Sequence, residues 1–226
     1  MTDFFQALAD HTAAEREYLL GSPIIRDALE GHVTVAQYRA FLAEAYHHVK
    51  CTVPLLMACG SRLGQDHEWL RGAIVHFIND EYGHQEWILN DIAAAGGDPE
   101  AVRHGTPAFA TEQMVSYAWD TIGRGNPVGF FGMVYVLEGT SIAIAGQAAA
   151  SIGRSLGLPE SAFSYLISHG EVDQEHVKFL AGLLNRLERE QDRRAVRHCA
   201  RRFFLLYAGI FRSLPAAGSG AERAVA

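Results

Sequence analysis

The sequence predicts an all-α protein, a single helical bundle of about seven or eight helices. Apolar residues recur at helical spacing along most of the 226 residues, and no segment of four or more alternates convincingly as a strand would. Helix ends are marked by residues that cap or interrupt helices, such as Thr34, the Gly96–Gly97 pair and Pro159. A hydrophobic content of 49% suits one domain with a substantial core.

Capping signals and apolar periodicity order the elements along the chain. We expect helices over residues 3–20, 23–29, 34–63 with a kink near Pro54, 66–95, 111–122, 127–156, 159–187 and 191–214. Residues 97–110 are rich in glycine and proline and are expected to form a connecting loop. No linker or repeat divides the chain, so we expect one domain over 1–215 and a flexible tail over 216–226.

Composition narrows the class of function. The net charge is −7 and the chain has only two lysines, so a basic run within residues 193–202 is expected to be a solvated face and not a nucleic-acid site. No run of about 18 apolar residues predicts a membrane span. The three cysteines form no CxxC pair, and the first residues do not resemble a signal peptide. We therefore expect a cytoplasmic protein without a disulfide framework.

Ionisable residues interrupt the apolar faces of three expected helices. Where a helix carries several of these residues, they are three or four positions apart and therefore share one helix face. Where a helix carries only one, that residue lies within an apolar stripe. The candidate metal ligands are Glu81, His84, Glu138, His169, Asp173 and His176. Burying one unpaired carboxylate costs several kcal/mol, so such a set demands compensating charge.

Two divalent metal ions would supply that charge. Three carboxylates contribute −3, two ions contribute +4, and neutral imidazoles add lone pairs without charge. Mixed oxygen and nitrogen ligands without thiolate suit iron, with manganese as an alternative, better than a structural zinc. Six side chains shared by two ions leave coordination positions open for dioxygen and substrate.

The spacing of these residues resembles a known family. Glu-x2-His, a Glu about 54 residues later and His-x3-Asp-x2-His about 31 further on are similar to the heme-oxygenase-like diiron oxidases and oxygenases, relatives of the TenA/PqqC-like helical proteins. The resemblance extends from the first helix to Leu214. Some members carry the first Glu at the position of Phe77, so Glu81 takes its place here.

The resemblance implies a heme-oxygenase-like fold, often as a homodimer, with two iron ions on the six residues named above. It implies dioxygen as co-substrate and an external electron donor. Members of the family oxidise small organic acids, amino acids or natural-product intermediates by carbon–carbon cleavage, desaturation or hydroxylation.

Three further residues are candidates for catalysis or for lining the pocket: Tyr135, Tyr165 and His47. The two tyrosines lie one helical turn before Glu138 and His169, and His47 belongs to a polar cluster on the third helix. Ordinary helix–helix contacts explain the three equally well. Asp80 and Asp91 are candidates for orienting a ligand imidazole, with surface roles favoured.

Other functions remain open at this point. A metal-independent TenA/PqqC-like enzyme could use a cysteine nucleophile, but no cysteine occurs between Cys59 and Cys199. A non-catalytic metal- or ligand-binding protein is a second alternative. Haem ligation by His11 is a third, although buried carboxylates would have no purpose beside a haem.

Overall fold

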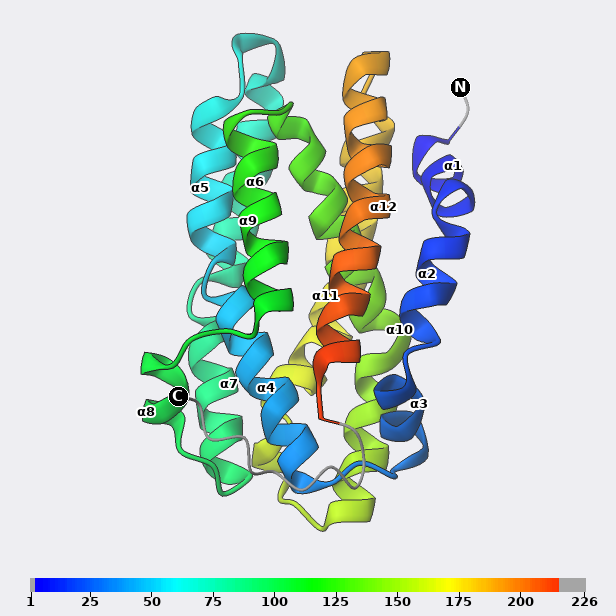
Figure 1. Cartoon of the computed structure of the whole chain (residues 1–226). Helices are drawn as coiled ribbons and strands as arrows, with labels where there is room; N and C mark the ends of the chain where they lie inside the picture. The colour runs from blue at the N-terminus through cyan, green and yellow to red at the C-terminus, as the bar shows by residue number, and fades with distance from the viewer. Residues whose placement is uncertain (1–2, 216–226) are drawn as a thin grey trace.

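The fold is built from α-helices joined by short turns (Figure 1). The computed structural model describes residues 3–215, apart from the side chains of residues 169–175. Within that range it contains no strand, which confirms the predicted all-α class. The α-helices are α1 (Phe4–His11), α2 (Ala13–Leu20), α3 (Pro23–Glu30), α4 (Val35–Val49), α5 (Thr52–Arg62), α6 (Glu68–Glu81), α7 (His84–Ala94), α8 (Pro99–His104), α9 (Phe109–Gly123), α10 (Phe131–Leu156), α11 (Ser164–Asn185) and α12 (Glu190–Ser213). Short 3-10 helices are η1 (Gln65–His67), η2 (Pro127–Phe130) and η3 (Glu160–Ala162).

The three C-terminal helices form the centre of the bundle. Helix α10 packs along α11 and α12, and α12 also packs against α2 and α9. Helix α4 lies against α7, and α5 lies against α6 (Figure 1). One apolar cluster is buried among α5, α6, α9, α10 and α12, and another joins α4, α7, the second half of α10 and the start of α11. The candidate site lies where these two clusters meet.

Local sequence explains the start and end of several helices. The Thr34 hydroxyl accepts a hydrogen bond from the backbone N–H of Gln37 (3.2 Å), and the Gln37 side chain accepts one from the Thr34 N–H (2.8 Å). This reciprocal capping box satisfies two donors at the start of α4. Gly157 adopts φ +62° and ends α10.

The described residues form more helices than the seven or eight expected, because several expected helices are interrupted. The expected helix over 3–20 breaks at Thr12, whose hydroxyl donates to the Leu8 carbonyl (2.8 Å). The expected helix over 34–63 is divided into α4 and α5 around Lys50, because Pro54 has no N–H to donate to the Lys50 carbonyl.

Two other expectations are also wrong in detail. The expected helix over 66–95 is divided into α6 and α7 at Tyr82–Gly83, where Gly83 adopts φ +93°. The expected loop over 97–110 contains α8, which Asp98 caps by accepting hydrogen bonds from two backbone N–H groups.

The segment Pro127–Leu156 is long and apolar enough to cross a membrane by length and composition. In the folded chain, 67% of its most apolar window is buried inside the bundle. That burial is typical of a central core helix, and α10 packs against α3, α11 and α12.

Candidate metal centre and pocket

A turn between two helices brings Glu81 and His84 together. Glu81 is the last residue of α6 and His84 is the first of α7. The Glu81 Oε2 atom lies 3.2 Å from His84 Nδ1, and both side chains are largely buried. The single helix expected here is wrong, but the two side chains are adjacent because the left-handed backbone of Gly83 turns the chain sharply.

Helices α6, α10 and α11 meet at the imidazole of His176. Its Nδ1 atom lies 3.6 Å from Glu138 Oε1, and its Nε2 atom lies 3.1 Å from Asp80 Oδ2. Asp80 Oδ2 also lies 3.3 Å from His76 Nε2. The ring of Phe77 lies edge-on to the His176 ring, with centroids 5.7 Å apart. An apolar ring thus lies beside the predicted ligand His176.

The other two predicted ligands, His169 and Asp173, have side chains outside the described residues. Their backbone belongs to α11, where positions 169, 173 and 176 share one helix face. Among the side chains that are described, no three His, Cys, Asp or Glu residues form a group that could hold a metal ion. The complete six-residue site therefore stays a prediction.

The chemistry of the described donors fits iron or manganese. His84, Glu138 and His176 are buried, with 5%, 7% and 3% of their surfaces exposed. The thiols lie elsewhere: Cys59 Sγ donates to the Pro127 carbonyl (3.3 Å), and burial raises its pKa to about 12. Such a thiol stays protonated, so the donors here are carboxylate oxygen and imidazole nitrogen, which iron and manganese accept.

An apolar pocket begins at two of the predicted ligands. Glu81 and Glu138 line it, and from there it follows α10 to Ile152, near the end of that helix. Fourteen residues of α-helix correspond to roughly 21 Å. The cavity volume is about 140 Å³, close to the roughly 150 Å³ cavity that holds a benzene molecule.

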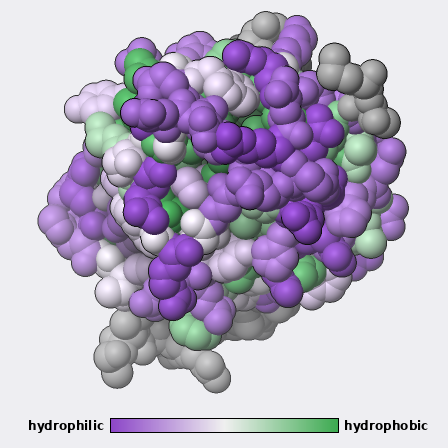
Figure 2. Space-filling model, turned by 90° about the horizontal axis from the view of Figure 1, so that it is seen from above, coloured by the Kyte–Doolittle hydropathy of each residue, from purple (hydrophilic) through white to green (hydrophobic). Residues whose placement is uncertain are grey.

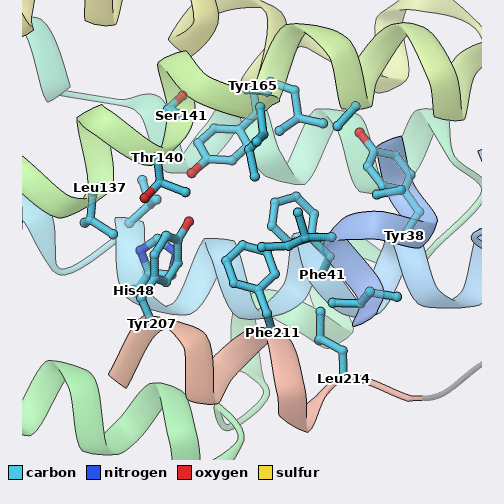
Figure 3. Close-up of a pocket in the computed structure, with 18 of the residues that line it drawn as sticks. Tyr38, Phe41, His48, Leu137, Thr140, Ser141, Tyr165, Tyr207, Phe211 and Leu214 are labelled. Carbon is cyan, nitrogen blue, oxygen red and sulfur yellow. The ribbon is translucent and has the colours of Figure 1, made fainter. Parts of the chain in front are cut away.

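The two ends of the pocket differ in polarity (Figure 3). Thr140, Ser141 and His48 gather at the end nearer to Glu138. Aromatic and aliphatic side chains, including Phe211 and Leu214, line the opposite end. The arrangement suits a molecule with one polar end and an apolar body.

The two candidate tyrosines occupy different surroundings. Tyr165 lines the pocket, and its ring points into it (Figure 3). Tyr135 does not line the pocket; its ring lies edge-on to Phe5 and Phe204, with centroids 5.5 Å and 6.1 Å away. Tyr135 therefore packs in the core beside the predicted centre, one turn before Glu138.

The polar cluster on α4 is also divided. His47 is buried outside the pocket, with its ring edge-on to Tyr46, and burial together with the Lys50 ammonium lowers its pKa to about 4. His48 lines the pocket, and its ring lies edge-on to that of Tyr207, with centroids 5.8 Å apart. Sequence reasoning missed Tyr207, because its apolar stripe in α12 is typical of any core helix.

Asp80 and Asp91 have separate roles. Asp80 contacts the Nε2 atom of His176 and is thus placed to orient that imidazole. Asp91 is fully buried and accepts hydrogen bonds from the backbone N–H groups of Ser164 (3.0 Å) and Tyr165 (2.9 Å). It caps the start of α11, so the surface role favoured for it is wrong.

His11, the residue considered for haem ligation, does not line this pocket. It is exposed at the end of α1 and lines a separate groove beside α12.

Solved structures with the same architecture define the class of fold. A domain of unknown function with a heme oxygenase-like fold from Shewanella denitrificans OS217 superposes with a TM-score of 0.83 and 25% identity, covering 91% of this chain and 89% of that one. A TenA homologue from Pseudomonas syringae pv. tomato DC3000 superposes with a TM-score of 0.76 and 12% identity, covering 91% of this chain and 90% of that one. The heme oxygenase of Leptospira interrogans superposes with a TM-score of 0.74 and 17% identity, covering 94% of this chain and 100% of that one. The fold is therefore heme-oxygenase-like.

The sequence then gives the family. Residues 39–208 match the family described as iron-containing redox enzymes, and the chain belongs to that family. The matched region includes all six predicted ligands. No curated protein matches the sequence.

Proposed function

We propose that this protein is a non-haem diiron oxidase or oxygenase that uses dioxygen to oxidise a small organic acid, amino acid or natural-product intermediate with an apolar body. The observation that carries the proposal is that two predicted ligands, the largely buried Glu81 and the buried Glu138, line an apolar pocket. A buried carboxylate pair with imidazoles at the end of a substrate-sized cavity is typical of a reactive metal centre.

The residues that would hold the two iron ions are Glu81, His84, Glu138, His169, Asp173 and His176. Bound iron would supply dioxygen activation and the redox chemistry that side chains lack. Each carboxylate of the set offsets part of the charge of the ions, which keeps a buried site close to neutral.

Asp80 would fix the tautomer of His176. If the Nε2–H of that imidazole donates to Asp80 Oδ2, at 3.1 Å, the lone pair on Nδ1 faces Glu138 Oε1, at 3.6 Å. The imidazole would then present a ligand nitrogen to the same space as the carboxylate. A neutral His176 held in this way adds a lone pair without adding positive charge.

The pocket walls would orient the substrate. Hydroxyl groups of Thr140, Ser141 and Tyr165 would bind its polar end near Glu138, and the apolar end of the pocket would take its hydrocarbon portion. The apolar lining also excludes water from the reacting atoms. An external electron donor completes the proposal, because iron oxidised during turnover has to be reduced again.

The test is metal loading followed by turnover. Protein loaded with Fe(II) under anaerobic conditions should contain two iron ions per chain, and it should consume dioxygen when a substrate from a panel of apolar carboxylic acids and amino acids is added. Glu138→Gln keeps the side-chain volume but removes the charge, so it should lose most of the iron and the oxygen consumption. Glu112→Gln, at an exposed position of α9, is the matched control and should behave as the unchanged protein.

Failure of the unchanged protein to bind iron would overturn the proposal. Equal iron content in the Glu138→Gln and Glu112→Gln variants would also overturn it, because the charge of a buried predicted ligand would then have no effect on iron binding.

A further inference from the structure

A groove lined by arginines lies apart from the pocket, on the surface of the bundle. It runs between α12 and the α1–α2 segment and has a volume of about 420 Å³. Its lining residues are mostly cationic or imidazole side chains: His11, Glu15, Arg194, Arg197, His198, Arg201, Arg202 and Leu205. The groove has four arginines and one carboxylate, so it is positively charged, whereas the whole chain has a net charge of −7.

Part of this charge is already engaged within the fold. Arg201 Nε lies 2.5 Å from Glu15 Oε1, and Arg197 pairs with Glu190. Arg194 and Arg202 are exposed, and neither forms an ion pair with any side chain in the described part of the chain. Two guanidinium groups are therefore available to an incoming anion, each able to bind a carboxylate in bidentate fashion.

The geometry favours a protein partner over a small anion or a nucleic acid. Arg194, Arg202 and His198 are all exposed, so no buried group converges on a single ion. The groove has one exposed apolar residue, Leu205 (41% exposed), beside its charges, as protein interfaces do. The overall acidity of the chain opposes the approach of nucleic acid. The end of the bundle viewed in Figure 2 is mainly hydrophilic.

Aromatic residues lie between the groove and α10. The guanidinium of Arg197 lies over the ring of Phe4, 5.6 Å from its centroid. The next residue, Phe5, lies edge-on to Tyr135 with centroids 5.5 Å apart, and Tyr135 is one turn before Glu138 on α10. Three aromatic residues, Phe4, Phe5 and Tyr135, thus connect the groove with the helix that carries Glu138.

We propose that this groove is the docking surface for an acidic one-electron carrier protein of the iron–sulfur or flavin class, an inference that rests on the proposed function. Carboxylates of the donor pair with Arg194 and Arg202, and the contact at Leu205 provides the apolar centre. Each reduced donor loses one electron to one Fe(III), so two encounters return two Fe(III) to two Fe(II).

The test measures binding separately from turnover. The probes are a plant-type [2Fe–2S] ferredoxin and a flavodoxin, both acidic, titrated into the full chain with and without iron. We expect Arg194→Glu with Arg202→Glu to weaken binding at least about tenfold, and added salt to weaken binding to the unchanged chain. The control, Arg26→Glu with Arg154→Glu, has the same net charge, uses exposed positions on α3 and α10, and should keep the affinity within about twofold.

Reduction of the loaded iron provides a second measurement. The groove variant should be reduced slowly by the carrier protein but at the normal rate by dithionite. Equal effects of the two double variants, binding of neither carrier, or tighter binding of a DNA duplex than of both carriers would overturn the proposal. Failure of the proposed function would appear separately, as an unchanged protein that binds no iron.

Discussion

Gly132 tests whether close contact between α10 and α12 fixes the predicted centre. A methyl group at Gly132 would lie 2.7 Å from the backbone nitrogen of Ala200 and 2.8 Å from the carbonyl oxygen of Val196. It would also lie 3.1 Å from the Cβ atom of Cys199. Two of these three atoms belong to the α12 backbone, which cannot move aside unless the helix itself shifts.

We expect Gly132→Ala to lower the free energy of unfolding by about 2 kcal/mol. Overpacking costs about 3 kcal/mol when backbone must move, and the helix preference of alanine over glycine returns about 1 kcal/mol. For a chain of this size the melting temperature should fall by about 4–8 °C. Glu138 is six residues along α10 from Gly132, so the same shift should also weaken Fe(II) binding.

The assay is thermal unfolding of the metal-free protein, followed by Fe(II) titration. Gly139→Ala is the matched control in the same helix, because a methyl group there meets nothing within 4 Å. It should raise the free energy of unfolding by up to about 1 kcal/mol through helix preference alone. If the two alanine variants unfold at the same temperature, the reasoning about the α10–α12 contact is refuted.

Three other changes test the site and its surroundings. Asp80→Asn should weaken Fe(II) binding about 10–100-fold, because it disturbs the orientation of His176; an unchanged affinity by titration would contradict this role. Ala148→Leu, at the apolar end of the pocket, should raise KM for long substrates without changing the iron content, and equal KM values for long and short substrates would argue against the assigned substrate direction. Burial and Lys50 lower the pKa of His47 to about 4, so the unfolded chain binds more protons between about pH 6.5 and pH 4, and stability should fall as the pH drops through this range. Urea unfolding at pH 7 and pH 5 should show a loss of up to about 2 kcal/mol, and a His47→Asn variant with the same loss would exclude His47 as the cause.

Much of the helical organisation could be predicted from local signals. Thr34 and Gln37 cap a helix by bonds that span three residues, and Gly157 ends another through its own backbone conformation. Glu138 could be found because a carboxylate inside an apolar stripe is costly wherever the stripe packs. Such features depend on neighbours in the chain and do not require knowledge of the other helices.

The breaks at Thr12 and Tyr82–Gly83 were not predicted, because the apolar pattern continues across them. The chain turns at Gly83, where the backbone adopts φ +93° between α6 and α7. Asp91 was assigned to the surface for a similar reason. Its partners, Ser164 and Tyr165, are more than seventy residues away in sequence, and only folding brings them to its carboxylate.

The sequence by itself determined the all-α class, the family and the set of side chains with which a metal centre could be made. These follow from apolar periodicity, capping and the cost of buried charge, which act within a few residues. Only the tertiary structure decided that Asp80 meets His176 and that Tyr165 lines the pocket while Tyr135 does not. The reason is geometric: distances between helices depend on side-chain packing across the bundle, and no local pattern specifies which faces come into contact.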